Sequence, residues 1–373
     1  MRYDFLDWLR VIAIFVLLFF HTGMLFVGWG WHITNAEIIP GLELPMDLAH
    51  RLRMPLLFLI AGAGMWFALK RRSGPALVGE RSLRLLLPAA IGMLLVVPPQ
   101  IYVERLVAGD FSGGYLDFLL QRVLEFRPYP EGNFSWHHLW FIVYLYVYVM
   151  LLLPLMLWWR RAQPVLRPGW WLFLLGLPLA LNEALLKPIY PETHALLNDW
   201  YTFNHYLLLT LYGFALASLR EGWDWLATQR RVSLGIAAAA TVLGVGALEL
   251  GIAPRDTPWD AFIANVFTWS WILVFLGFGR KHFSFSNRLL AWAREASYPV
   301  YIFHQTVIVV LAYFVIREPW AAGVKYWVVL VGTVALSVGL YEITRRFAVT
   351  RVMFGMKKRE RTGSAAGAPA RAV

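Results

Sequence analysis

The feature that most constrains this chain is a series of apolar segments too long and too numerous for a water-soluble core. Most of them approach the roughly 20 residues that a helix needs to cross a ~30 Å hydrocarbon layer. About ten can be drawn, at 8–29, 53–69, 83–103, 139–159, 170–186, 205–219, 232–252, 261–279, 298–316 and 324–344. The sequence therefore predicts an all-α, polytopic membrane protein of about ten transmembrane helices.

The composition agrees with a membrane protein and excludes several other classes. Of the 373 residues, 59% are hydrophobic and 15% charged, whereas soluble domains carry roughly 25% charged residues. The absence of cysteine excludes disulfides, thiolate catalysis and cysteine-ligated metals. A net charge of +11 is also typical of nucleic-acid binders. Here the basic residues lie in loops between apolar segments, so we expect them to set topology, with no nucleic-acid partner.

The distribution of Lys and Arg predicts the orientation. With a cytoplasmic N-terminus, 25 of the 34 basic residues fall on the cytoplasmic side, as the positive-inside rule requires. This assignment needs an even number of spans and places the C-terminus in the cytoplasm as well. We predict one transmembrane domain over residues 1–355, followed by a disordered cytoplasmic tail over 356–373.

The first apolar segment contains "LRVIAIFVLLFFH", with Arg10 near one end and His21 at the other. On a helix these residues share a face and lie about 16 Å apart along the axis. Ionisable groups inside a membrane cost on the order of 2.5–3.5 kcal/mol, so both are expected to face a groove in the protein. A neutral histidine there can accept a proton from a hydroxyl. The alternatives are a histidine that links two helices by a hydrogen bond, and an arginine that reaches the lipid headgroups.

Further polar residues mark the later segments. Arg81 and Arg84 lie one turn apart in "ERSLRLLLP" and could grip phosphates through paired hydrogen bonds; alternatively they serve topology or contact lipid headgroups. In "SYPVYIFHQ", Tyr301 and His304 share a helix face with Tyr298.

Glu342 precedes two arginines in "LYEITRR". It either assists His21 or pairs with one of those arginines. His138 and Trp140 begin the fourth span in "HHLWFIVYLYVYV", where they contact a substrate or belong to an aromatic belt at the interface.

Two segments predicted to lie outside the membrane, "WHITNAE" and "MDLAHRLRMP", carry a polar cluster that suits a hydroxyl-rich ligand or is simply a solvated loop. Its members are His32, Asn35, Glu37, Asp47, His50 and Arg53. The sequence contains no glycine-rich phosphate loop, serine nucleophile elbow or HExxH motif, so we expect no metal cofactor.

Taken together, these motifs resemble the acyltransferase-3 family of membrane proteins. The family signature of an Arg, ten residues and a His fits Arg10 and His21. Further matches are "RMPLLFLIAG" (53–62), "RSLRLLLP" (81–88), "HLWFI" (138–142), "YPVYIFH" (298–304) and "LYEITRR" (340–346). "WHITNAE" and "HRLRMP" look closest to the branch with the OpgC-type succinyltransferases of periplasmic glucans. Arg84 and Pro88 are one residue further apart than the family pattern leads us to expect.

The resemblance implies an acyl-CoA-dependent O-acyltransferase in the bacterial inner membrane. It implies an acyl-CoA donor in the cytoplasm and an acceptor hydroxyl, on a glycan or another envelope molecule, at the opposite face. His21 would be the catalytic base, with Arg10 and Glu342 beside it. Arg10, Arg81, Arg84, Tyr301 and His304 would bind the donor, and His32, Asp47, His50, Arg53, His138 and Trp140 the acceptor.

Two other classes of protein also place ionisable residues inside a membrane. A transporter or flippase uses such groups as proton relays, and it predicts inverted repeats, which we do not find in the sequence. A structural membrane subunit would pair the same groups with one another and would leave no substrate cavity. The sequence does not name the acyl group, the acceptor or the oligomeric state.

Overall fold

The computed structural model describes residues 3–251 and 257–357. Within those ranges the regular structure is helical and contains no strand. The α-helices are α1 (Asp4–Gly23), α2 (Glu43–Leu69), α3 (Gly74–Arg81), α4 (Leu87–Ile91), α5 (Pro98–Ala108), α6 (Tyr115–Phe118), α7 (Trp140–Ala162), α8 (Gly176–Leu186), α9 (Trp200–Ser218), α10 (Gly222–Glu249), α11 (Pro258–His282), α12 (Arg288–Val315), α13 (Ala322–Thr344) and α14 (Ala348–Met353). The predicted disordered tail lies outside the described residues from 358 onward.

Eight helices in the described part of the chain are long and apolar enough to cross a membrane. They are Asp4–Gly23, Glu43–Leu69, Gly74–Ala108, His137–Ala162, Gly222–Ala247, Pro258–His282, Arg288–Val315 and Ala322–Thr344. This confirms the prediction of an all-α, polytopic membrane protein. The other two predicted spans are also helical. Trp170–Leu186 is short, and the first half of α9 contains the polar residues Thr202, Asn204 and His205.

Two predicted boundaries at the start of the chain were wrong. Helix α1 ends at Gly23, so the last six residues of the predicted span 8–29 are turns. Helix α2 begins at Glu43, ten residues before the predicted start at residue 53. Asp47, His50 and Arg53 therefore lie on a helix and not in an outer loop. Polar side chains are compatible with this helix because Asp47 and His50 line a cavity of the protein, described below, and Arg53 packs on Phe20.

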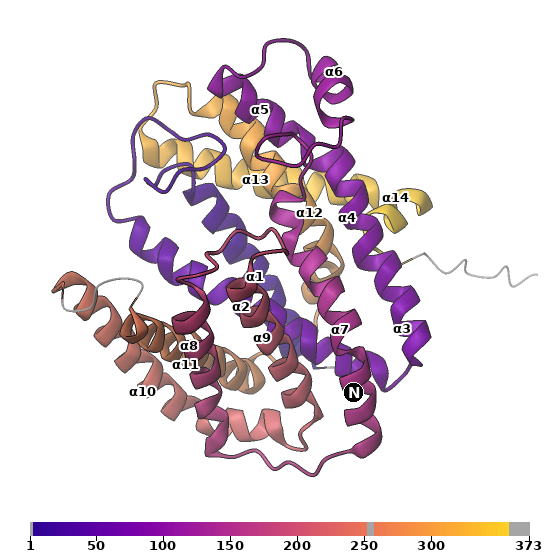
Figure 1. Cartoon of the computed structure of the whole chain (residues 1–373), viewed down its shortest axis with the longest axis vertical. Helices are drawn as coiled ribbons and strands as arrows, with labels where there is room; N and C mark the ends of the chain where they lie inside the picture. The colour runs from indigo at the N-terminus through magenta and orange to yellow at the C-terminus, as the bar shows by residue number, and fades with distance from the viewer. Residues whose placement is uncertain (1–2, 252–256, 358–373) are drawn as a thin grey trace, which may run out of the picture.

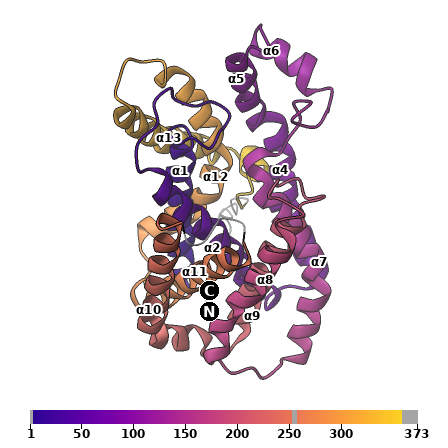
Figure 2. The same ribbon diagram turned by 60° about the vertical axis from the view of Figure 1, so that its left-hand side comes forward.

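Helix α1 is central to the bundle and packs against α2, α11, α12 and α13. Figures 1 and 2 show α3, α4 and α5 following one another along one side of the molecule next to α7, while α10 and α11 lie on the opposite side. His21 therefore lies on a helix that is surrounded by other helices.

The span Gly74–Ala108 is not a regular α-helix. It contains two π-helical segments, η1 (Ser82–Leu86) and η2 (Gly92–Val96), between α3, α4 and α5. A π-helical turn takes up an additional residue without breaking the helix. Segment η1 lies between Arg81 and Pro88 and contains Arg84.

Helices α2 and α9 approach each other closely where both carry glycine. A Cβ atom on Gly213 of α9 would collide with the backbone of Leu59, and one on Gly62 of α2 would collide with the carbonyl of Thr210. Small residues allow membrane helices to pack with their backbones in contact. Since α2 carries His50 and Arg53, this contact also fixes the position of the site.

We predict that Gly213→Ala destabilises the protein. The new methyl group must push the two backbones apart, and such overpacking costs typically about 1–3 kcal/mol. Gly64→Ala is the matched control, because a Cβ at Gly64 meets nothing within 4 Å and alanine favours the helix. The midpoint of thermal unfolding in detergent should fall for Gly213→Ala only. Equal midpoints for both variants would contradict the close contact.

Candidate functional site

The centre of the site is a pair of histidines from α1 and α12. His21 Nδ1 lies 2.7 Å from His304 Nε2, and the two ring planes are within 9° of each other. His304 is fully buried, and its Nδ1 lies 2.5 Å from the carbonyl oxygen of Tyr301. His21 is half-buried.

These partners determine where the protons lie in the neutral pair. A carbonyl oxygen only accepts hydrogen bonds, so His304 Nδ1 carries the proton and donates to Tyr301. His304 Nε2 is then an acceptor, and His21 Nδ1–H donates to it. The lone pair of His21 is consequently on Nε2, which no group of the described residues engages in a hydrogen bond. A histidine held in this way can act as a base through Nε2.

His138 lies behind the pair, in the interior of the protein. Its Nε2 donates to the carbonyl of Ile302 at 2.8 Å, and its ring centre lies 5.3 Å from that of His304. Tyr301 donates its hydroxyl to the carbonyl of His138. His138 is therefore buried in the protein and does not belong to an aromatic belt at the interface. Tyr301 lies beside the histidine pair, and its expected contact with the donor stays a prediction.

A chain of amide side chains, which sequence reasoning missed, continues from His138. Gln100 Nε2 lies 3.3 Å from His138 Nδ1, and Gln305 donates to Gln100 Oε1 at 3.1 Å. Gln305 Nε2 is also 3.0 Å from His32 Nε2. An amide side chain inside an apolar span is costly unless it is hydrogen-bonded, and that was the signal available in "PPQ" and "FHQ".

Arg53 of α2 is a buried cation that packs on Phe20, the residue before His21. It is 6% exposed, and its guanidinium carbon lies 3.4 Å above the ring of Phe20. Its Nη2 lies 3.3 Å from His50 Nδ1, whereas Nε and Nη1 are buried without a hydrogen-bond partner in the described part of the chain. Buried donors of a charged group are expensive to leave unsatisfied. They are therefore available to an anionic group beside His21.

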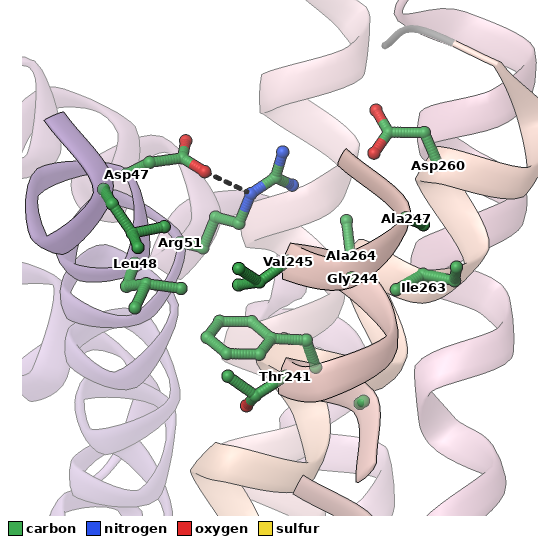
Figure 3. Close-up of a pocket in the computed structure, with 13 residues that line it drawn as sticks. Asp47, Leu48, Arg51, Thr241, Gly244, Val245, Ala247, Asp260, Ile263 and Ala264 are labelled. Carbon is green, nitrogen blue, oxygen red and sulfur yellow. Dashed lines mark ion pairs between the residues drawn. The ribbon is translucent and has the colours of Figure 1, made fainter. Parts of the chain in front are cut away.

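A polar cavity opens between α2, α8, α9 and α11. It encloses about 880 Å³, including open solvent. An adjoining pocket of about 660 Å³, shown in Figure 3, has a mostly apolar wall from α10 and shares Asp47, Arg51 and Asp260 with the cavity. The cavity is lined by Asp47, His50, Arg51, Pro55, Glu183, Lys187, Glu192, Tyr201, Thr202, His205, Tyr206, Asp260, Asn265 and Thr268.

Glu192 brings a negative charge to this cavity from the segment between α8 and α9. Its carboxylate lies 2.8 Å from His194 Nε2 and 3.6 Å from His50 Nε2. Burial alone would raise the pKa of Glu192, but the two histidines hold this pKa well below its usual range. Trp140 stacks on His194 with ring centres 4.0 Å apart. Trp140 therefore packs against residues at the wall of the cavity and is not part of an aromatic belt at the membrane interface.

The opposite end of the bundle, which we call the basic end, holds Arg10, Arg81, Arg84 and Arg294. Arg10 donates to the carbonyl of Arg294 at 3.4 Å. Four residues later on α12, Tyr298 donates to the carbonyl of Arg84 at 2.8 Å. Segments α1, η1 and α12 therefore meet here, because Arg10 of α1 and Arg84 of η1 bond to residues of α12 that are one turn apart. Tyr298 is an aromatic residue at the basic end, whereas Tyr301 and His304 lie further along α12 beside His21.

Glu342 does not contact His21. Its Oε1 accepts hydrogen bonds from Trp292 at 2.8 Å and from Arg345 at 3.2 Å. Trp292 precedes His304 by twelve residues on α12, which corresponds to about 18 Å along the helix. Glu342 therefore pairs with a neighbouring arginine, which was the alternative role. The expectation that Glu342 orients His21 was wrong. His304 holds His21 instead.

Comparison with known proteins identifies the family. The model of the acyltransferase-3 family, described as an acyltransferase domain, matches residues 3–342. The chain therefore belongs to this family of membrane acyltransferases.

Relatives named "Glucans biosynthesis protein C" are similar over nearly the whole length. Those from Salmonella schwarzengrund, Salmonella agona and Salmonella choleraesuis are each 21% identical to the chain, over 95% of both sequences.

Proposed function

We propose that this protein transfers an acyl group, such as acetyl or succinyl, from cytoplasmic acyl-CoA to a hydroxyl of an extracytoplasmic glycan or other envelope acceptor. In this proposal it lies in the bacterial inner membrane with both termini in the cytoplasm, as the distribution of basic residues predicts. The observation that carries the proposal concerns His21 Nε2, whose lone pair has no hydrogen-bond partner in the described residues. We place this atom between the basic end and the polar cavity. Membership of the acyltransferase family favours an enzyme over a transporter.

The donor would bind with its phosphates at the basic end and its thioester near His21. Arg10 and His21 are about 16 Å apart along α1, and Arg294 and His304 are about 15 Å apart along α12. Both separations are close to the length of an extended pantetheine arm. Arg81 Nε is buried without a hydrogen-bond partner among the described side chains, so it is available to a phosphate oxygen.

The transfer reaction would use His21 twice. His21 Nε2 takes the proton of the acceptor hydroxyl as its oxygen attacks the thioester carbonyl. The resulting oxyanion is stabilised by the free N–H groups of Arg53. When the intermediate collapses, the carbon–sulfur bond breaks and His21 returns its proton to the CoA sulfur. His304 accepts from His21 Nδ1–H throughout and stabilises the positive charge of the imidazolium.

The acceptor would approach through the polar cavity. Carboxylates such as Asp47 and Glu192 accept hydrogen bonds from hydroxyl groups, and aromatic rings such as Tyr201 and Tyr206 pack against sugar rings. His50 lines the cavity and contacts Arg53, so the cavity leads toward Phe20 and His21. The name of the relatives supports a glucan as the acceptor.

We predict that His21→Gln and His21→Ala both lose acyl transfer. A positioned base contributes roughly 10²–10⁴-fold to a rate, and glutamine keeps a hydrogen bond to His304 but cannot take the proton. The measurement is acyl transfer from acyl-CoA by purified protein, with His282→Gln as the control because His282 is exposed.

The glutamine variant separates the two roles of His21. If His21 only links α1 to α12, His21→Gln should keep most of the activity, and that result would refute the catalytic role. Melting temperatures of the same samples exclude a loss of folding as the cause.

We also predict that Arg81→Ala/Arg84→Ala weakens acyl-CoA binding. Each charge-assisted contact to a phosphate contributes roughly 1.5–3 kcal/mol, or about 10- to 100-fold in Kd. The matched control is Arg161→Ala/Arg167→Ala, which removes two exposed arginines from the side that we also assign to the cytoplasm. Binding is measured in sealed vesicles with acyl-CoA on one face at a time. Unchanged affinity, or binding only from the periplasmic face, would contradict the proposal.

A further inference from the structure

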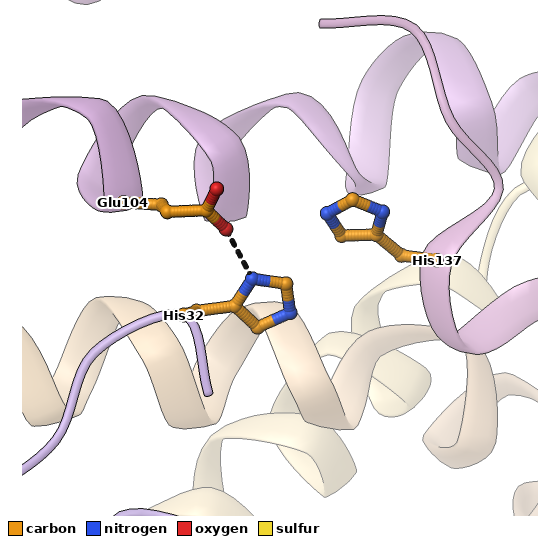
Figure 4. A group of neighbouring side chains, drawn as sticks. All are labelled: His32, Glu104 and His137. Carbon is orange, nitrogen blue, oxygen red and sulfur yellow. Dashed lines mark hydrogen bonds and ion pairs between the residues drawn. The ribbon is translucent and has the colours of Figure 1, made fainter. Parts of the chain in front are cut away.

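Three side chains from distant parts of the sequence meet near the loop that follows α1. They are His32 in the α1–α2 connection, Glu104 of α5 and His137, which begins the 3₁₀ turn η4 (His137–Leu139). One potential ligand atom of each lies within 4.8 Å of the other two. Figure 4 shows the Glu104 carboxylate pointing at the ring of His32, with the ring of His137 beyond.

The outer atoms of these three groups are already held in place. Tyr129 donates to Glu104 Oε1 at 3.1 Å, and Ser135 Oγ lies 2.7 Å from His137 Nδ1. The Gln305 amide lies 3.0 Å from His32 Nε2. Metal ligands have such second partners, and Tyr129 and Ser135 engage Glu104 Oε1 and His137 Nδ1 in this way. Here they leave His32 Nδ1, Glu104 Oε2 and His137 Nε2 for a shared ligand.

His137 Nε2 gives an independent indication of a missing ligand. It is buried and has no hydrogen-bond partner within the described ranges, and an unsatisfied buried nitrogen costs about 1–3 kcal/mol. The backbone of His137 also has a φ of +39°, a region that non-glycine residues rarely adopt and that often marks functional positions.

We propose that His32 Nδ1, Glu104 Oε2 and His137 Nε2 bind one divalent transition-metal ion, with Zn²⁺ as the best match. Two imidazole nitrogens and one carboxylate oxygen form a common zinc ligand set, with room for a further ligand. Without an ion, His32 Nδ1–H donates to Glu104 Oε2 at 2.5 Å. When the ion binds His32 Nδ1, the proton moves to His32 Nε2, and the Gln305 amide turns so that its oxygen accepts from this N–H. His32 Nδ1 and Glu104 Oε2 separate to about 3.3 Å, the spacing set by Zn–ligand distances of about 2.0–2.1 Å, while His137 moves closer.

The ion would fasten the α1–α2 connection and the start of η4 to α5 and would not touch the reacting atoms. The α1–α2 connection also carries Trp31, whose ring centre lies 6.2 Å from that of His21 and 5.0 Å from that of His32. Fixing His32 thus holds Trp31 against His21. No sequence motif indicated the site, and we expected no metal, because its ligands come from three distant segments. The proposal does not depend on the acyl-transfer reaction.

Zinc binding by the full-length protein tests this inference. The purified protein, with its affinity tag removed, is stripped with a chelator and titrated with Zn²⁺ in detergent, by calorimetry and elemental analysis. We expect one Zn²⁺ per chain and a higher melting temperature. Glu104→Gln and His137→Asn should weaken binding by at least about 100-fold, and asparagine is chosen because it tolerates positive φ.

Two further variants exclude trivial explanations. Tyr129→Phe removes only the partner of Glu104 and should weaken Zn²⁺ affinity by about 10–100-fold, whereas His50→Gln changes a different His–Glu pair and should leave Zn²⁺ affinity unchanged. The inference is overturned if the stripped protein takes up no Zn²⁺ at micromolar concentration. It is also overturned if Glu104→Gln and Tyr129→Phe bind Zn²⁺ as tightly as the unaltered chain.

Discussion

The hydrogen bond between His21 and His304 is the interaction on which the proposed chemistry depends. It joins α1 to α12 inside the bundle, and the carbonyl of Tyr301 fixes which nitrogen of His304 carries the proton. That proton in turn leaves the lone pair of His21 on Nε2. The backbone carbonyl of Tyr301 therefore determines, through His304, which nitrogen of His21 can act as the base. No carboxylate takes part in these two hydrogen bonds.

The other polar groups follow from the cost of placing charge inside a membrane. Each ionisable side chain in the bundle must find a partner or a cavity. At the basic end arginines are held by backbone carbonyls and by carboxylates such as Glu80, which is 3.3 Å from Arg84. At the other end, Asp47 and Arg51 pair along the wall of the polar cavity at 3.6 Å. Arg53 keeps two unsatisfied donors between these ends, which is the arrangement expected where an anion forms during a reaction.

Much of the fold could be predicted from the sequence, because apolar length and the spacing of charged residues are local properties. The positions of eight helices that are long and apolar enough to cross a membrane, and the shared face of Arg10 and His21, follow from such patterns. The start of α2 was missed because Asp47 and His50 are typical of a loop, and the sequence does not show that they line a protein cavity. The partner of His21 was also missed, because a helix face does not reveal which residue of another helix lies at the same height. For the same reason Glu342 was assigned to His21, and the group of His32, Glu104 and His137 was not foreseen.

A double-mutant cycle on His21 and His304 tests the central claim most directly. The single-turnover rate of acyl transfer is measured for the unaltered protein, His21→Ala, His304→Ala and the double variant, all of comparable melting temperature. If His304 acts by orienting His21, His304→Ala should lower the rate by about 10²-fold or more. It should then have almost no effect when His21 is already alanine, because residues that act as a unit are not additive. Additive losses from the two substitutions would contradict the account.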